Sequence, residues 1–390
     1  MIHKNLYFSP IFSGVSSLKI SRSHFIYSFS PLLQGRVLSF LEIQGSSFSK
    51  FLYRPVGVEN AHYFSIIIGD RYSITSRVNA NCAKFYDCVF KDCISDVRGG
   101  AIYVSDSSLH VVIMRCGFLH CVSFCEGYSA GGVAVYSASS VKMDFCCFYN
   151  CSNKNDPGAY QVVPHGLYLN STSINCTNEY LNGRNEVSSN WGSMSGGNFF
   201  TFNYNNSTRT YSINQHGGGY VFSTLTSVNC IGTFCQLSNS EGAGFISFIA
   251  TSTKQGWFNY WNFINNSCLI NSWIFHTPGW LSGIIPCFLT CSFIHNSNVK
   301  MSQYSDKPVF SGCHISSIDE GNMFGVFQDG TVFGSGMNDI RSINIPATEK
   351  CWQRAGSQTI AEHTLFKSYP FVSILGSFLV FSLEVLISKY

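Results

Sequence analysis

Hydrophobic residues recur along this chain in short runs separated by polar and glycine-rich stretches. Three passages share the pattern Cys-x-Phe-x-x-Cys, and they are Cys88–Cys93, Cys116–Cys121 and Cys146–Cys151. Their phenylalanines Phe90, Phe118 and Phe148 lie 28 and then 30 residues apart. A fixed period of this length indicates a repeat architecture, in which one unit cannot bury its apolar face alone.

The same pattern continues further along the chain with asparagine in place of the last cysteine. It surrounds Phe263 and Phe293, which are 30 residues apart, and Phe263 follows Phe148 by 115 residues, or almost four units. Between them we expect weaker copies at Thr172–Cys176 and Thr226–Cys230, which are 54 residues apart, or two units. The shared period predicts one continuous repeat array.

Glycines precede several short β-prone runs at a similar interval. They are Gly99–Gly100, Gly131–Gly132, Gly196–Gly197, Gly218–Gly219 and Gly242–Gly244. Each unit therefore holds two or three short strands joined by polar corners, and none contains a 12-residue amphipathic pattern. This excludes the helical repeat classes.

The pattern also predicts which side chains point inward. Side chains two apart on a strand share one face, whereas the last cysteine of each motif requires a corner to point the same way. Units stacked at about 4.8 Å would then align equivalent residues in columns, with roughly nine or ten coils over residues 80–345. The predicted column residues are Cys88, Phe90, Cys93, Cys116, Phe118, Cys121, Cys146, Phe148, Cys151, Phe263 and Phe293.

The Phe motif followed by Gly-Gly-Ala-Ile-Tyr-Val at 99–104 resembles the right-handed parallel β-helix proteins of the pectin-lyase-like superfamily. The likeness is greatest to polymorphic-membrane-protein-like surface proteins of parasitic protists. It is clear over residues 80–155 and looser to about residue 330. The resemblance implies right-handed coiling and display at a cell surface. The middle units depart from the pattern, and we expect residues 1–79 to lack it entirely.

We therefore expect an all-β right-handed parallel β-helix, a β-solenoid, with a C-terminal apolar helix. Residues 1–79 would form irregular first coils or a cap, 80–348 the β-helix, and 349–370 a polar closing segment. Residues 371–387, FVSILGSFLVFSLEVLI, are long enough to span a membrane but contain Glu384. They would either anchor the chain in a membrane or pack as a helix or strand on the end of the stack.

Composition narrows the function classes. Aromatic residues reach 15% and charged residues only 12%, which favours strands and polar turns. The net charge is +3, and we find no run of basic residues that would recruit nucleic acid.

The 17 cysteines admit several interpretations. No Cys-x-x-Cys is present, which argues against zinc ribbons and thioredoxin chemistry. We favour buried thiols that pack as small hydrophobic groups. Pairs such as Cys88 with Cys116 could instead form disulfides in an oxidising compartment. Residues 1–20 lack the uninterrupted apolar run of a cleavable signal peptide.

We predict no catalytic, cofactor-binding or metal-binding residue. Asp319–Glu320 is the only adjacent acidic pair, and Asp329, Asp339 and Arg341 lie near it in sequence. Gln215–Gly219 resembles an oxyanion loop but has no accompanying Gly-x-Ser-x-Gly. The histidines are scattered without ligand spacing, and they include His110, His120, His165, His276, His295 and His314.

The sequence thus favours a non-enzymatic solenoid displayed at a membrane or cell surface, binding a host or extracellular glycan or protein. Sites for N-glycosylation occur at Asn150, Asn170, Asn175, Asn205, Asn206 and Asn265. The alternatives are an intracellular protein and a polysaccharide lyase or hydrolase. Acidic and basic side chains clustered on one face would favour the enzyme, whereas a face of Ser, Asn and aromatic residues would oppose it.

Overall fold

The computed structural model describes residues 12–26, 28, 31–59, 82–106, 108–125, 130–138, 140–153 and 159–164, and shorter segments between 170 and 334. Every element in these segments is a β-strand, and the strand pairings between them are parallel. The prediction of an all-β chain with parallel strands is therefore confirmed. Within the described residues, no helix is long and apolar enough to cross a membrane. The segments 349–370 and 371–387 lie outside the described residues.

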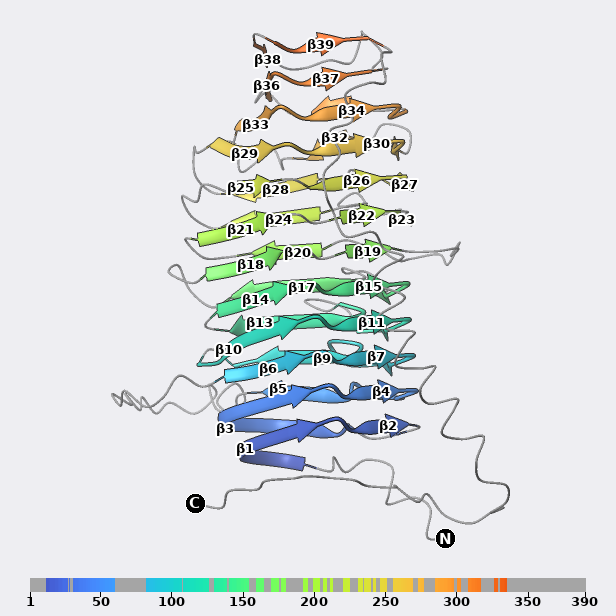
Figure 1. The fold of residues 1–390 in the computed structure, drawn as a ribbon, viewed down its shortest axis with the longest axis vertical. Helices are drawn as coiled ribbons and strands as arrows, with labels where there is room; N and C mark the ends of the chain where they lie inside the picture. The colour runs from blue at the N-terminus through green and yellow to red at the C-terminus, as the bar shows by residue number, and fades with distance from the viewer. Residues whose placement is uncertain are drawn as a thin grey trace, which may run out of the picture.

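The strands form tiers that rise from β1 to β39 (Figure 1). A 21-stranded sheet contains two series of strands, which separate after the long strand β3 (Leu33–Gln44). The first half of β3 pairs with β5 and its second half with β6. The two series are therefore two faces of one bent sheet.

The first series contains the strands that precede the Cys-x-Phe motifs. After β1 (Phe12–Ser21) and β3 it comprises β6 (Cys82–Tyr86), β10 (His110–Met114), β14 (Ser140–Asp144), β18 (Asn170–Ile174), β21 (Phe199–Asn203), β25 (Ile231–Thr233), β29 (Gln255–Asn259), β33 (Ile285–Leu289), β36 (Val309–Ser311) and β38 (Val326–Phe327). The second series comprises β5 (Val56–Glu59), β9 (Ile102–Ser105), β13 (Val133–Ala138), β17 (Tyr160–Pro164), β20 (Gly192–Ser195), β24 (Tyr220–Thr224), β28 (Ile246–Ala250), β32 (Trp273–His276) and β35 (Lys300–Ser302).

A 12-stranded sheet carries the Phe of each motif. It comprises β2 (His24–Ile26), β4 (Ser47–Ser49), β7 (Val89–Lys91), β11 (Gly117–Leu119), β15 (Cys147–Tyr149), β19 (Thr177–Glu179), β22 (Asn206–Thr208), β26 (Gln236–Ser238), β30 (Asn262–Ile264), β34 (Ser292–Ile294), β37 (His314–Ile315) and β39 (Val332–Phe333). Two short sheets of three strands follow it: β8 (Ile94–Ser95), β12 (Val122–Ser123) and β16 (Ser152–Asn153), then β23 (Tyr211–Ser212), β27 (Glu241–Gly242) and β31 (Ser267–Cys268).

The register follows the sequence period. Phe90 pairs with Phe118, and Phe118 with Phe148. From Phe148 the pairing passes through three further strands before it reaches Phe263, so the structure contains the four steps that the spacing predicts. The weaker copies are not in register, however. Cys176 is followed by β19 of the 12-stranded sheet, and the equivalent strand two tiers later is β26, which follows Cys235. Cys230 is followed instead by β25, a strand of the first series. The expected equivalence of Thr226–Cys230 with Thr172–Cys176 is therefore wrong.

Inward side chains stack tier upon tier and form one apolar core. The phenylalanine rings lie parallel at centroid distances of 5.1 Å for Phe90–Phe118, 4.8 Å for Phe118–Phe148 and 4.8 Å for Phe263–Phe293. A second aromatic column, Phe258–Phe288–Phe310–Phe327, occupies the inner face of the first series in the upper tiers. Such stacked pairs contribute about 0.5–1.5 kcal/mol each beyond the apolar area that they bury.

The glycine pairs allow close approach of neighbouring tiers. A Cβ atom on Gly132 would lie 2.6 Å from the carbonyl oxygen of Ala159 in the next tier, and one on Gly100 would collide with the carbonyl of Gly131. The backbone N–H of Gly132 instead donates to that Ala159 carbonyl. Only glycine fits at these two positions, which explains the glycines before β9 and β13.

Replacing Phe118 by alanine should destabilise the fold strongly, because the ring is fully buried between two stacked neighbours. We expect a loss of about 3–5 kcal/mol in the free energy of unfolding, measured by chemical denaturation. The control is Phe145→Ala, since Phe145 is 43% exposed and should change stability by less than about 0.5 kcal/mol. Equal losses in the two variants would contradict the stacked core.

Candidate functional site

Each corner that leads from the first series into the 12-stranded sheet is built in the same way. A residue in the left-handed region turns the chain, and the next residue points inward. The turning residues are Arg22 (φ 48°), Gly45 (φ 57°), Asp87 (φ 54°), Arg115 (φ 52°) and Phe145 (φ 52°). The inward residues that follow are Ser23, Ser46, Cys88, Cys116 and Cys146, which we call the first corner column. This is the corner that the parity of the motif requires.

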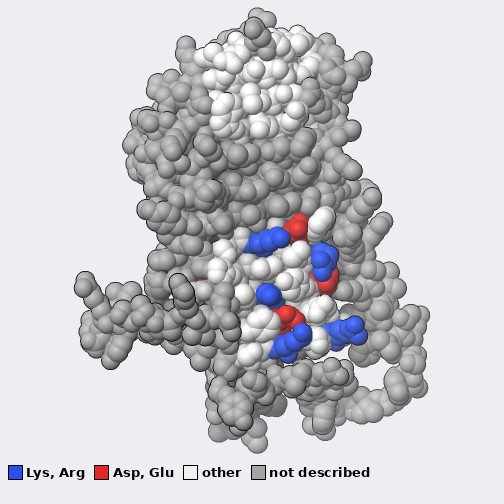
Figure 2. Space-filling model, turned by 60° about the vertical axis from the view of Figure 1, so that its left-hand side comes forward, with Lys and Arg blue, Asp and Glu red and all other residues white. Residues whose placement is uncertain are grey.

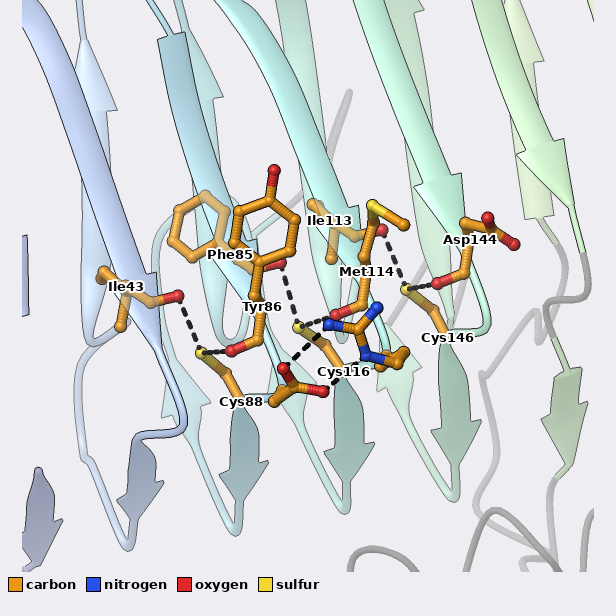
Figure 3. Close-up of polar contacts among 11 residues, drawn as sticks. Ile43, Phe85, Tyr86, Cys88, Ile113, Met114, Cys116, Asp144 and Cys146 are labelled. Atoms are coloured by element: carbon orange, nitrogen blue, oxygen red, sulfur yellow. Dashed lines mark hydrogen bonds and ion pairs between the residues drawn. The ribbon is translucent and has the colours of Figure 1, made fainter. Parts of the chain in front are cut away.

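Each thiol of this column contacts two backbone carbonyls (Figure 3). The Cys116 Sγ–H lies 3.3 Å from the carbonyl oxygen of Met114, two residues earlier, and 3.5 Å from that of Phe85 in the preceding tier. Cys88 and Cys146 repeat both contacts, Cys88 with Tyr86 and Ile43 and Cys146 with Asp144 and Ile113. The thiols therefore act as hydrogen-bond donors at the corners as well as apolar filling.

Serine takes the same position in the first two tiers. Ser46 Oγ donates to the Gln44 carbonyl at 3.1 Å, and Ser23 Oγ donates to the Ser21 carbonyl at 2.9 Å. Each is followed two residues later by a stacked phenylalanine, Phe25 or Phe48. Residues 1–79 do lack the Cys-x-Phe spelling, but Ser-x-Phe takes its place at these two corners with the same hydrogen bond to the carbonyl two residues earlier.

A second corner column contains the last residue of each motif. Cys121 Sγ lies 3.5 Å from the Phe90 carbonyl of the preceding tier, and Cys151 Sγ lies 3.4 Å from that of Phe118. In the upper tiers Asn296 Nδ2 donates to the equivalent Phe263 carbonyl at 2.9 Å. Asparagine thus replaces cysteine with the same donor function. The column residues are Cys93, Cys121, Cys151, Asn266 and Asn296.

The buried thiols are free and unreactive in character. Cys88 and Cys116 are both free, so the structure contains no disulfide between them. Burial raises the pKa of Cys116, Cys121 and Cys151 well above the ordinary value, because an apolar core disfavours the thiolate. Cys147, by contrast, is disulfide-bonded. The corner columns therefore stabilise the fold and do not supply a nucleophile.

A cluster of charged side chains lies on the outer surface of the first series. Figure 2 shows these side chains gathered over the lower tiers. We call them the charged face, and they are Lys19, Arg22, Glu42, Lys84, Asp87, Arg115, Lys142 and Asp144. They come from β1, β3, β6, β10 and β14 and the corners after them. Basic residues outnumber acidic ones, so the face is positive overall.

Two ion pairs organise this face. Arg115 forms a two-pronged pair with Asp87, with Nε–Oδ1 at 2.6 Å and Nη2–Oδ2 at 2.9 Å. This hydrogen bond raises the pKa of Arg115. Lys19 Nζ lies 2.7 Å from Glu42 Oε1. Both carboxylate oxygens of Asp87 are thus engaged by the Arg115 side chain.

A buried arginine lies on the other series. Arg54 is 3% exposed, its Nη1 donates to the Arg98 carbonyl at 2.8 Å, and its guanidinium stands 4.7 Å from the ring centroid of Tyr103. Its Nε and Nη2 also donate to Gln34 Oε1. Arg54 therefore joins neighbouring tiers, a structural role that sequence spacing did not indicate.

The remaining candidates from the sequence do not assemble into a site. Asp319–Glu320, Asp329, Asp339, Arg341, Gln215–Gly219 and His165 lie outside the described residues. His110 Nδ1 is 2.7 Å from Ser140 Oγ, and His120 Nδ1 is 3.1 Å from Asp92 Oδ1, both on the outside. Among the described residues no group of three His, Cys, Asp or Glu side chains could hold a metal ion.

The glycosylation motifs fall at different places. Asn150 and Asn265 are corner residues in the left-handed region, and the Asn265 side chain is exposed. Asn170 and Asn206 lie in strands β18 and β22. Asn175 and Asn205 lie outside the described residues. Of the two motif asparagines whose side chains the structure describes, Asn150 and Asn265, Asn265 is the more exposed.

Comparisons with protein-family models, with curated proteins and with solved structures give no match. The class of protein therefore rests on the chain's own geometry: parallel strands in register, inward columns of Phe, Cys and Asn, and one charged outer face.

Stability should fall at alkaline pH because of the buried thiols. Their pKa is raised in the folded chain, so stability is full below about pH 8.5, the unfolded pKa, and is lost as the pH rises above it. We expect Cys116→Ser to reduce this loss by about 1–2 kcal/mol at pH 10, since serine keeps the corner hydrogen bond without ionising. Denaturation midpoints at pH 7 and pH 10 measure the effect, and identical pH dependence in both chains would contradict it.

Replacing Asn296 by alanine should also destabilise the fold. The Asn296 Oδ1 accepts from the backbone N–H and from Nδ2 of Asn266, both at 3.0 Å, and these buried donors would lose their acceptor. We expect a cost of about 1–3 kcal/mol in thermal or chemical denaturation. Ser297→Ala is the control, because Ser297 is exposed one residue later. A neutral Asn296→Ala would show that the asparagines only fill space.

Proposed function

We propose that this chain is a right-handed parallel β-helix that is displayed at a cell surface and binds a ligand without catalysis. The single observation that carries the proposal is the charged face, a set of outward side chains held in fixed register by the tiers beneath them. A periodic and well-packed sheet of this kind supplies an extended binding surface. The ligand would be a glycan or a protein outside the cell.

Display at the surface is supported by three features. The motif resemblance is to surface proteins, the apolar segment 371–387 offers a membrane anchor, and Asn265 presents an exposed glycosylation motif. Buried thiols of raised pKa resist oxidation, so their free state is compatible with an oxidising exterior as well as with the interior of a cell.

The test uses intact cells that express the full chain with an internal tag. We expect external protease to remove the tagged band, and an N-glycosidase to shift the band in lysates. In the Asn265→Gln variant the glycosidase shift should be smaller, while the protease sensitivity should not change. A protected and unshifted band would assign the chain to the interior of the cell and overturn surface display.

A polysaccharide lyase or hydrolase is the second candidate, because acidic and basic side chains do gather on one face. Asp87 and Asp144 come from tiers on either side of Arg115. Asp144 is aligned with Tyr86, the residue before Asp87, so the two acidic residues lie two tiers apart, which is roughly 10 Å along the stack. That distance is at the upper limit for a carboxylate pair of the inverting type. The ion pair between Asp87 and Arg115 disfavours this candidate, since both oxygens of the Asp87 carboxylate are already bonded to the guanidinium.

Incubation of the purified chain with acidic and neutral polysaccharides tests the enzyme candidate. We expect no new reducing ends and no unsaturated products. If products form and the Asp144→Asn variant forms none, the non-enzymatic proposal is wrong. The Glu179→Gln variant is the control for a general effect of removing one acidic residue, since Glu179 lies on the other sheet.

A further inference from the structure

Lysines recur at every second tier along one outward column of the charged face. The strand register aligns Lys19 with Glu42, Glu42 with Lys84, Lys84 with Val112, and Val112 with Lys142. Tiers in a sheet are about 4.8 Å apart, so the backbone positions of successive lysines are separated by roughly 10 Å. These residues are 65 and 58 positions apart in sequence, and only the register brings them into one line.

Two of the three lysines have charge to offer a ligand. Among the described residues, Lys84 and Lys142 make no ion pair, whereas Lys19 is paired with Glu42. Arg22, at the corner beside this column, also makes none within that part of the chain. The guanidinium of Arg115 donates two hydrogen bonds to the Asp87 carboxylate, through Nε and Nη2. The face therefore presents separated point charges rather than a free guanidinium fork.

The surface between these charges is suited to a polymer that lies flat. Val112 is the uncharged member of the column between Lys84 and Lys142, and Tyr86 is a half-buried aromatic residue that points outward from β6 beside Lys84. Extended parallel strands make this a surface of fixed spacing. A ligand that runs along the stack from Lys84 to Lys142 would contact a cation, then the apolar Val112, and then a second cation.

We propose that this column binds a linear sulfated polysaccharide laid along the stack of tiers. A sulfate ester has several equivalent oxygens and can be held by a lysine point charge from many directions, whereas a planar carboxylate is matched best by an arginine fork. Duplex DNA carries one phosphate per 3.4 Å on each strand, about three times denser than the lysines. Glu42 lies in the column between Lys19 and Lys84, and Asp87 and Asp144 lie on the same face. A dense polyanion would place charges against these carboxylates, whereas widely spaced sulfates can align with the lysines alone.

This inference rests on the proposed function, since it names the ligand of the same face. The experiment uses the purified full chain and fluorescent oligosaccharides of chondroitin sulfate, which is much less densely sulfated than heparin, in two lengths. The shorter one spans a single lysine interval, and the longer one spans the whole column from Lys19 to Lys142. Anisotropy titrations at several salt concentrations give the dissociation constant and its salt dependence.

We expect the longer oligosaccharide to bind more tightly than the shorter one. The double variant Lys84→Gln/Lys142→Gln should weaken its binding roughly tenfold and reduce the salt dependence. The matched control is Lys50→Gln/Lys91→Gln, which removes the same charge from the corner and outer face of the 12-stranded sheet and should bind as the parent does. Circular dichroism checks that both variants fold.

Several outcomes would overturn the inference. Equal losses in the two double variants would show binding by net charge alone. Binding of unsulfated hyaluronan as tight as that of chondroitin sulfate would assign the face to carboxylate, and tighter binding of duplex DNA or heparin would assign it to dense polyanions. No binding of chondroitin sulfate by a chain that still reaches the cell surface would reject this ligand but leave the proposed surface display standing.

Discussion

The structure depends on hydrogen bonds at many of its corners, where an inward cysteine or asparagine side chain bonds a backbone carbonyl of the tier before it. A chain that turns sharply leaves carbonyls in the interior, and buried polar groups without partners cost free energy. Cys116 bonds the Phe85 carbonyl, Cys121 bonds the Phe90 carbonyl, and Asn296 bonds the Phe263 carbonyl. Because this bond requires a small donor at a fixed position, it determines where cysteine, serine and asparagine stand in the motif and holds the phenylalanine between them in line.

The bond also explains the unusual cysteine content. A thiol is apolar enough for a core and still a weak donor, so it satisfies a carbonyl without the desolvation cost of a stronger polar group. Serine takes the corner position near the start of the stack, as at Ser46. Where asparagine takes it, as at Asn296, its side-chain oxygen also accepts a hydrogen bond from Nδ2 of Asn266. The cysteines are thus a structural choice, and their raised pKa follows from the same burial.

Much of the fold could be predicted from the sequence because the period and the parity of Cys-x-Phe-x-x-Cys are local properties. The all-β class and the parallel pairing followed from them. The N-terminal tiers were missed because only the cysteine spelling was sought, although Ser23–Phe25 and Ser46–Phe48 carry the same donor. The repeat unit at Cys235 was predicted five residues too early, at Cys230. The connections between strands differ in length from tier to tier, and residue spacing alone does not show where the extra residues lie. The charged face could not be predicted, since Lys19, Lys84 and Lys142 are spaced too far apart to form any sequence pattern.

The corner bond gives the stack a direction. In every described tier where it is seen, the donor lies on the later tier and the carbonyl on the earlier one, as Cys88 to Ile43, Cys151 to Phe118 and Cys313 to Phe288 illustrate. During synthesis the earlier tier leaves the ribosome first and has its acceptors in place before the next donor emerges. Each finished tier is then a template for the one that follows, and the chain can be assembled in the order in which it is translated.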